Sequence, residues 1–213
     1  MNIDYVLFDL DVSLLILHKY CIYNLYFNNL KGLLIDSEKV YTNVTNDILK
    51  PFNKQFNWKI KSQMMGKHER VASEYLINEL QLPISIDDYL QIRNQKQFEA
   101  WPYLELKPGA LKLVKHLVNN KIPIAVATGS RRESLNHKIK AEEVKHLMSL
   151  FGDNVITADD VPIGKGKPLP DIFLLAAQKI GVDVNVKENL SHGLVFEDAI
   201  PGVQAGLNAN MNG

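Results

Sequence analysis

The sequence contains a single cysteine, Cys21, among its 213 residues. One cysteine cannot form a disulfide within the chain, and it cannot supply a cluster of thiolate metal ligands. Net charge is also lacking, because 24 basic residues balance 24 acidic ones. No overall field therefore draws the chain toward nucleic acid or an anionic membrane, and we expect neither as a partner.

Long apolar runs are missing as well. The most apolar run extends only from Leu14 to Leu17, far short of the ~20 apolar residues that span a bilayer. Asp4, Asp9 and Asp11 interrupt any signal-peptide pattern at the amino terminus. Together with the single cysteine, these absences predict a cytoplasmic protein.

Four short apolar runs have the pattern of buried β-strands. They are Tyr5–Phe8, Ile122–Ala127, Val155–Thr157 and Gly193–Phe196. Helical patterns lie between them, over residues 109–118 and 171–180. Strands that alternate with helices predict an α/β fold with a parallel sheet covered on both faces.

Residues from about 36 to 103 follow a different pattern. Their apolar residues recur at helical spacing, as in Val40, Val44 and Ile48, without a convincing buried strand. Pro51 and Pro83 punctuate the pattern. This stretch predicts a helical module inserted after the first strand.

Residues that can carry chemistry follow the predicted strands, where an open parallel sheet binds its ligands. In chain order they are Asp9 and Asp11, Thr128–Ser130, Lys167, and Glu197 with Asp198. Each also has a structural explanation: an Asp after a strand is often a turn residue, Ser130 is suited to cap a helix, and Lys167 lies in a Gly- and Pro-rich stretch typical of a solvated loop. Their combination at four strand ends favours one shared site.

Four segments resemble the successive motifs of phosphatases of the haloacid-dehalogenase superfamily. They are Phe8–Asp11, Ala127–Ser130, Gly166–Asp171 and Val195–Asp198. Three further segments, Met64–Lys67, Ile122–Thr128 and Phe196–Val203, resemble one branch of this superfamily more closely. That branch contains pseudouridine-5'-phosphatase and the glycerol-3-phosphatases. The resemblance implies a Rossmann-like core, residues 1–11 and 104–213, and an inserted helical cap domain, residues 32–103 with flanking linkers.

The resemblance also implies a catalytic role for each site residue. Asp9 would be the nucleophile that forms an aspartyl-phosphate, and Asp11 would be the general acid and base. Thr128, Gly129 and Lys167 would bind the phosphoryl group.

A Mg²⁺ ion, which prefers oxygen ligands, is the implied cofactor. Its implied ligands are the carboxylates of Asp9 and Asp198 and the backbone carbonyl of Asp11. Glu197 would support the site through an indirect contact.

The implied activity is hydrolysis of a small phosphorylated metabolite, with pseudouridine 5'-phosphate as the leading candidate. Glycerol 3-phosphate is an alternative substrate. A sugar phosphomutase is an alternative reaction, because the same aspartyl-phosphate can return its phosphoryl group to a sugar.

The chain departs from the family pattern over the 20 residues Val12–Lys31. In the family a glycine follows the second aspartate at once, whereas here the matching Gly32 follows this segment. The segment contains no acidic residue and is rich in residue types whose codons are dominated by A and T. We hypothesise that it is an intron translated by mistake in a gene model; the alternative is a genuine insertion, such as an apolar flap over the site. The non-enzymatic alternative for the function is that the chain as written is a binding protein or an inert product of a faulty gene model. The resemblance further implies a strand and a helix after Met211, whose loss would expose a sheet edge.

Overall fold

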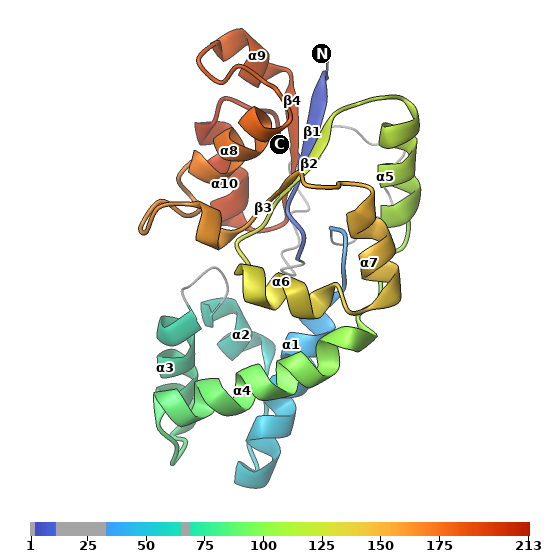
Figure 1. Ribbon diagram of the computed structural model, residues 1–213. Helices are drawn as coiled ribbons and strands as arrows, with labels where there is room; N and C mark the ends of the chain where they lie inside the picture. Colours follow the sequence, from blue (N-terminus) through green and yellow to red (C-terminus); the bar gives the residue numbers. More distant parts are fainter. Residues whose placement is uncertain (1–2, 12–32, 65–68) are drawn as a thin grey trace.

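The computed structural model describes residues 3–11, 33–64 and 69–213 of the chain. The anomalous segment 12–31 lies outside the described residues, as do Gly32 and residues 65–68. In Figure 1 the sheet and its flanking helices form the upper part of the molecule, and helices α1–α4 form the lower part.

Four parallel strands form one sheet in the order β3-β2-β1-β4. The strands are β1 (Tyr5–Phe8), β2 (Ile124–Ala127), β3 (Val155–Ile156) and β4 (Gly193–Phe196). Leu7 of the central strand β1 lies opposite Ala125 on one side and Val195 on the other. β2 begins later than predicted, because the Ile122 N–H bonds to the end of the preceding helix and Pro123 has no N–H to offer the sheet.

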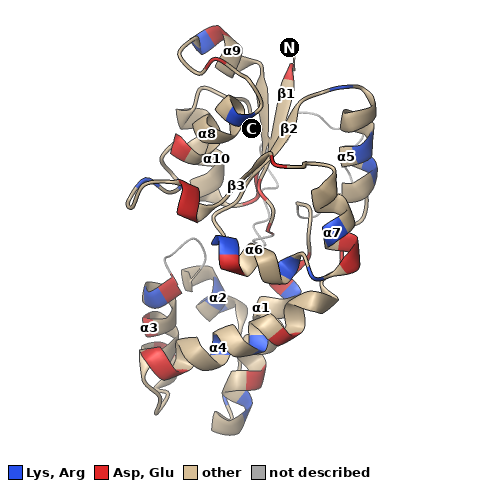
Figure 2. Cartoon of the chain, viewed as in Figure 1, with Lys and Arg blue, Asp and Glu red and all other residues tan. Residues whose placement is uncertain are grey.

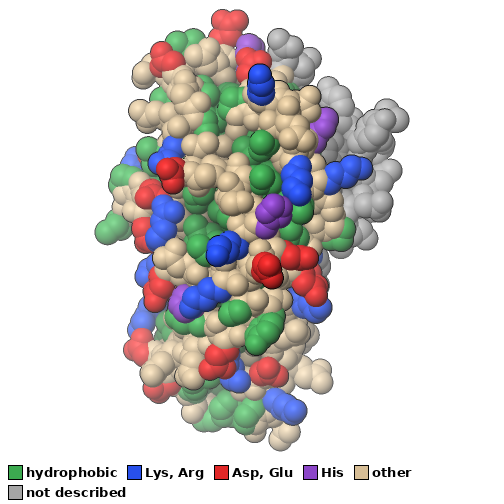
Figure 3. All heavy atoms as spheres, turned by 45° about the vertical axis from the view of Figure 1, so that its right-hand side comes forward, with side chains coloured by type: hydrophobic (Ala, Val, Ile, Leu, Met, Phe, Trp, Pro, Cys, Tyr) green, Lys and Arg blue, Asp and Glu red, His purple; other side chains and the backbone are tan. Residues whose placement is uncertain are grey.

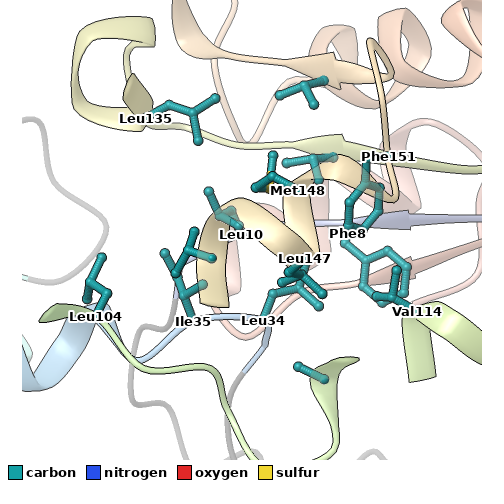
Figure 4. Close-up of a cluster of buried hydrophobic side chains, with 14 of the residues drawn as sticks. Phe8, Leu10, Leu34, Ile35, Leu104, Val114, Leu135, Leu147, Met148 and Phe151 are labelled. Atoms are coloured by element: carbon teal, nitrogen blue, oxygen red, sulfur yellow. The ribbon is translucent and has the colours of Figure 1, made fainter. Parts of the chain in front are cut away.

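Successive residues of β1 point to opposite faces of the sheet, and helices cover both faces. Phe8 packs on the face covered by α5 (Ala110–Asn119), α6 (Arg132–Lys138) and α7 (Glu142–Ser149). Figure 4 shows this cluster, in which Phe8 lies against Phe151, Leu147 and Val114.

Leu7 packs on the opposite face, which α8 (Asp171–Lys179) and α10 (Ile200–Asn208) cover. The short helix α9 (Lys187–Ser191) precedes β4. Because β1 is buried on both faces, its sequence is a continuous apolar run and does not alternate with polar residues.

The described residues of the insert between β1 and β2 form helices joined by turns and loops, with no β-strand, as the sequence pattern predicts. Its helices are α1 (Ser37–Leu49), α2 (Trp58–Met64), α3 (Glu69–Leu80) and α4 (Ile86–Ala100), with short 3-10 turns at Lys50–Phe52 and at η2 (Trp101–Tyr103). They enclose a separate core around Leu49, Leu76 and Tyr89. No helix in the described part of the chain has the length and apolar character needed to cross a membrane.

Two neighbouring linkers join the insert to the sheet. Ile35 on the way in lies opposite Leu106 on the way out in an antiparallel bridge. Beside this bridge, the Lys107 ammonium pairs with the Asp36 carboxylate at 2.9 Å. The insert is therefore held beside the ends of the strands to which its linkers lead.

Basic and acidic side chains are interspersed on the face shown in Figure 3, so neither sign of charge predominates there. This distribution agrees with the equal numbers of basic and acidic residues in the sequence.

The last residues of the chain run beside the outer edge of β4. Asn212 pairs in parallel with Leu194, and its carbonyl accepts a hydrogen bond from the Val195 N–H at 2.7 Å. This edge of β4 is therefore paired at that point.

The described residues on either side of segment 12–31 are neighbours in space. The Ile35 N–H donates to the Leu10 carbonyl at 3.3 Å, and both side chains belong to the same buried cluster (Figure 4). A chain in which Asp11 were joined directly to Gly32 would connect these positions with a short loop.

We predict that deletion of residues 12–31 leaves the fold intact and raises its stability. A shorter loop costs less entropy to close, about 0.6 kcal/mol for each halving, so the gain is ~1–2 kcal/mol. Thermal unfolding of the full chain and of the deletion variant measures it. A midpoint several degrees lower in the deletion variant would show that the segment makes stabilising contacts, and a mature transcript that retains its codons would contradict the intron hypothesis.

Candidate active site

Asp9 and Asp11 follow β1 at the edge of the sheet that faces the insert. The Asp9 N–H continues the sheet by donating to the Phe196 carbonyl of β4 at 3.0 Å, which fixes where its side chain begins. The Asp11 N–H then donates to Oδ2 of Asp9 at 3.1 Å. Figure 2 shows acidic positions where the strands end toward the insert. The sheet thus places the predicted nucleophile in a buried position, with 7% of Asp9 exposed.

Lys167 lies at the centre of the acidic cluster and not in solvent. Its ammonium donates to Asp9 Oδ1 at 2.7 Å, to Glu197 Oε1 at 2.5 Å and to the Ala127 carbonyl at 3.1 Å. The face of the Phe173 ring lies 5.0 Å from the ammonium. The solvated-loop alternative for Lys167 is therefore wrong, because two buried carboxylates draw its charged end inward.

Burial sets the protonation behaviour of this pair. Burial raises the pKa of Asp9 to about 6. The positive charge of Lys167 opposes this rise, whereas the negative charges of Glu197 and Asp11 add to it. Burial alone would lower the pKa of Lys167, but the attraction of Asp9 and Glu197 outweighs it and the pKa lies above its usual value. The lysine therefore stays charged, while Asp9 is held in surroundings that are short of positive charge.

Asp9, Glu197 and Asp198 form a set of oxygen donors that fits a divalent cation. One carboxylate oxygen from each lies within 4.8 Å of the other two, close to the ~4 Å that separates opposite ligands of a Mg²⁺ ion. The shortage of positive charge around Asp9 points the same way. The residues present thus fit the implied cofactor.

The Glu197 carboxylate is already engaged on both sides. Oε1 accepts from Lys167, and Oε2 accepts from the backbone N–H groups of Asp198 and Ala199, each at 3.0 Å. These contacts suit the indirect supporting role predicted for Glu197 better than direct binding of a cation. That role and the roles of the other site residues stay predictions.

The predicted phosphate-binding residues lie at the end of β2. Thr128 is fully buried, and its N–H donates to the Ile156 carbonyl of β3 at 2.9 Å. Its hydroxyl oxygen lies 3.5 Å from Asp11 Oδ2 and accepts from the Ser130 N–H at 3.1 Å. Gly129 is exposed beside them, with open space where a side chain would stand. Thr128 therefore meets the acidic cluster, whereas Gly129 lies at its rim.

Ser130 does not cap the following helix, so that structural explanation for it is wrong. The cap of α6 is Arg131, without a side-chain hydrogen bond. The Ser130 hydroxyl instead donates to Asp11 Oδ2 at 2.7 Å. A serine before a helix has the same local pattern in either case, so only the tertiary contact distinguishes them.

Lys138 is the main site residue that the sequence reasoning missed. It is the last residue of α6, has no exposed surface, and donates to both carboxylate oxygens of Asp11 at 2.6 Å. Burial alone would raise the pKa of Asp11, but Lys138 and Ser130 outweigh it and the pKa lies below its usual value. The signal available was the spacing from Leu135, which places Lys138 on the buried face of a helix.

Gly202 is a second residue that the sequence reasoning did not assign to the site. It lies in the first turn of α10, where a Cβ atom would overlap the Glu197 carboxylate. The absence of a side chain at Gly202 therefore gives Glu197 the room to reach Lys167.

Comparison with known proteins identifies the family of this chain. A family model described as haloacid dehalogenase-like hydrolase matches residues 3–210. The chain is 38% identical to (DL)-glycerol-3-phosphatase 2 of Arabidopsis thaliana over 86% of its length and 75% of the relative. It is 35% identical to the "Probable pseudouridine-5'-phosphatase" of Drosophila melanogaster, over 86% of its length and 77% of the relative.

The fold has a solved counterpart as well. The crystal structure of a conserved haloacid dehalogenase-like protein of unknown function from Agrobacterium tumefaciens superposes with a TM-score of 0.71 at 19% identity, over 99% of this chain and 81% of that one. The predicted α/β fold is confirmed, as are the predicted branch and the predicted enzyme class, a phosphoric monoester hydrolase. The chain belongs to the haloacid dehalogenase-like hydrolase family.

Proposed function

We propose that this enzyme hydrolyses a small phosphorylated metabolite through an aspartyl-phosphate on Asp9. The observation that carries the proposal is the buried Asp9 carboxylate, held by Lys167 at the carboxyl end of the central strand with Asp11 beside it. The relatives named above supply the leading substrates, pseudouridine 5'-phosphate and glycerol 3-phosphate. We propose a cytoplasmic location on the evidence of the single cysteine.

The reaction proceeds in two steps that use the two aspartates differently. In the first, an Asp9 carboxylate oxygen bonds to phosphorus while the ester P–O bond breaks. Lys138 holds the pKa of Asp11 below its usual value, but this step requires Asp11 in its protonated form, which gives its proton to the departing alkoxide. In the second, ionised Asp11 takes a proton from water, whose oxygen attacks phosphorus and displaces the Asp9 carboxylate. Inorganic phosphate leaves, and both aspartates return to their starting states.

The remaining residues stabilise charge during both steps. Lys167 lies 2.7 Å from Asp9 Oδ1 and can neutralise negative charge on the phosphoryl group, with Thr128 as a hydroxyl donor. Asp9, Asp198 and the Asp11 carbonyl would hold Mg²⁺, which supplies positive charge to the phosphoryl oxygens when bound.

The test is release of inorganic phosphate from a panel of phosphorylated metabolites, with Mg²⁺ and with a chelator in its place. We expect Mg²⁺-dependent release, fastest from pseudouridine 5'-phosphate or glycerol 3-phosphate. Turnover of a sugar phosphate that needs a bisphosphate activator and releases no phosphate would favour the phosphomutase. No turnover of any ester would favour the non-enzymatic alternative.

Asp9→Asn is predicted to remove nearly all turnover and to leave no trappable aspartyl-phosphate, because an amide is a poor nucleophile. Phosphate release and acid-quenched labelling measure both effects. Asp4→Asn is the matched control: Asp4 lies just before β1 at its opposite end, largely exposed and paired with His192, and the variant should retain full activity. Retention of a tenth of the normal rate by Asp9→Asn, a loss of only ~1.4 kcal/mol, would exclude Asp9 as the nucleophile.

The same variant is predicted to change how stability depends on pH. Because the Asp9 pKa rises from its usual 3.8 to about 6 on folding, the folded chain binds more protons than the unfolded chain between about pH 4 and pH 6. Stability of the unchanged chain therefore falls as pH rises through this range, and Asp9→Asn lacks this loss. With a chelator present, the thermal unfolding midpoint of Asp9→Asn should rise relative to that of the unchanged chain as the pH increases from about 4 to about 6. A difference between the two midpoints that does not change with pH would show that the pKa of Asp9 is ordinary.

Lys167→Ala is predicted to lower the rate by a hundredfold or more, as is usual for loss of one preorganised charge-stabilising group. Its thermal midpoint should also fall, because Asp9 and Glu197 lose their shared partner in a buried place. Lys165→Ala, an exposed lysine in the same loop, is the control and should alter neither quantity. A Lys167→Ala rate equal to that of the control would mean that the third motif has been misassigned.

A further inference from the structure

Lys138 is a buried lysine for which the proposed mechanism has no role. It comes from α6, and its side chain has no exposed surface. Its ammonium donates to Asp11 Oδ1 and Oδ2, each at 2.6 Å, and to the Ser130 hydroxyl at 2.9 Å. Within the described part of the chain, Asp11 is the carboxylate that pairs with it.

The surroundings of Lys138 are aromatic and come from the insert side of the molecule. The ammonium lies 5.3 Å from the ring centre of Trp101 in the 3-10 turn η2 and 6.0 Å from that of Tyr41 in α1. Cation–π attraction contributes in such a place but does not replace lost hydration. The Asp11 carboxylate is therefore the group that makes a charge at Lys138 tolerable.

Stability alone does not explain this arrangement. A buried ion pair can often be replaced by apolar residues of similar volume with no loss of stability, whereas removal of one partner alone is costly. A site that needed only packing could hold Lys138 and Asp11 as apolar residues. The pair is thus better explained by what it does to Asp11, the residue that exchanges protons in the proposed reaction.

Lys138 fixes the direction of the Asp11 carboxylate. Asp11 lies beyond the end of β1, so the sheet ladder does not set the direction of its side chain. Two bonds from one ammonium, one to each oxygen, set the plane of the carboxylate, and Ser130 holds Oδ2 as well. Lys167 bonds to only one oxygen of Asp9 and is shared with Glu197, so the carboxylate of Asp11 is the more firmly oriented of the two.

We propose that Lys138 is the positioning residue for Asp11, holding the carboxylate where it meets the oxygen of the departing alcohol; this role rests on the proposed function. The proposal predicts that loss of Lys138 slows hydrolysis most for esters whose leaving group needs a proton. An alkyl phosphate leaves as a poor alkoxide and needs the proton from Asp11. p-Nitrophenyl phosphate releases a stable phenolate and hardly needs it.

The experiment compares kcat/KM of the full chain and of Lys138→Met on two esters. One is p-nitrophenyl phosphate, and the other is whichever of glycerol 3-phosphate and pseudouridine 5'-phosphate the unchanged chain hydrolyses faster. Since kcat/KM reports the steps up to loss of the alcohol, we expect a fall of about a hundredfold for the alkyl ester, the low end of what general acid–base catalysis supplies. The fall for p-nitrophenyl phosphate should stay below tenfold.

Two further variants separate positioning from other effects. Lys140→Met, at an exposed lysine two residues after the same helix, should change the hydrolysis of neither ester. In an Asp11→Asn background, Lys138→Met should cause no further loss on the alkyl ester, because the group that it positions is gone. Equal losses on both esters, or an additional loss in that background, would assign Lys138 to the phosphoryl group or to the fold and overturn the proposal.

Thermal unfolding gives a readout that needs no turnover. Lys138→Met should lower the midpoint, since it leaves the Asp11 carboxylate without its partner, and adding Asp11→Asn should restore part of the loss. If Lys138→Met keeps the midpoint of the unchanged chain, the ion pair does not form in solution and the proposal fails. Failure of the proposed function would show separately, as retention of a tenth or more of the normal rate in Asp9→Asn.

Discussion

The arrangement of the site depends on a balance of charge at one edge of the sheet. Two aspartates follow β1 and an acidic pair follows β4, and parallel pairing of these strands brings both groups together. Like charges repel strongly in such a place, because the dielectric constant is low. Lys167 from a loop and Lys138 from a helix end supply the opposing charge. The loop, helix and strand ends must therefore hold one another in place.

The position of Lys138 beside Asp11 depends on both α6 and the insert. Lys138 can reach Asp11 because α6 ends beside the strand edge, and Trp101 and Tyr41, from the end and the start of the insert, enclose its ammonium. The paired linkers bring the insert to this edge through the Ile35–Leu106 bridge. Aromatic residues of the insert thus enclose an ion pair whose two members belong to the core, and a movement of the insert would change the surroundings of Lys138.

The sequence predicted the parts of the site that local order determines. Asp9, Asp198 and Thr128 directly follow or lie close to buried strands, and parallel strands end at a common edge, so their meeting could be expected. Lys138 could not be found in this way, because a lysine at the end of a short helix is usually solvated and only tertiary packing buries it. The direction of Ser130 was hidden for the same reason, since a hydroxyl before a helix can face either way.

Two aspartates only two residues apart have pKa values displaced in opposite directions, and the cause is how each lysine is shared. Lys167 divides its hydrogen bonds between Asp9 and Glu197, so burial prevails and the Asp9 pKa is raised. Among the described residues, Lys138 pairs with one carboxylate alone, that of Asp11, and bonds to both of its oxygens, so attraction prevails and the Asp11 pKa is lowered. A divalent cation bound by Asp9 would supply the positive charge that Lys167 divides. The surroundings of Asp9, which are short of positive charge, are thus also where the carboxylate oxygens fit a metal ion. The Asp11 carboxylate, in contrast, is already paired with the ammonium of Lys138.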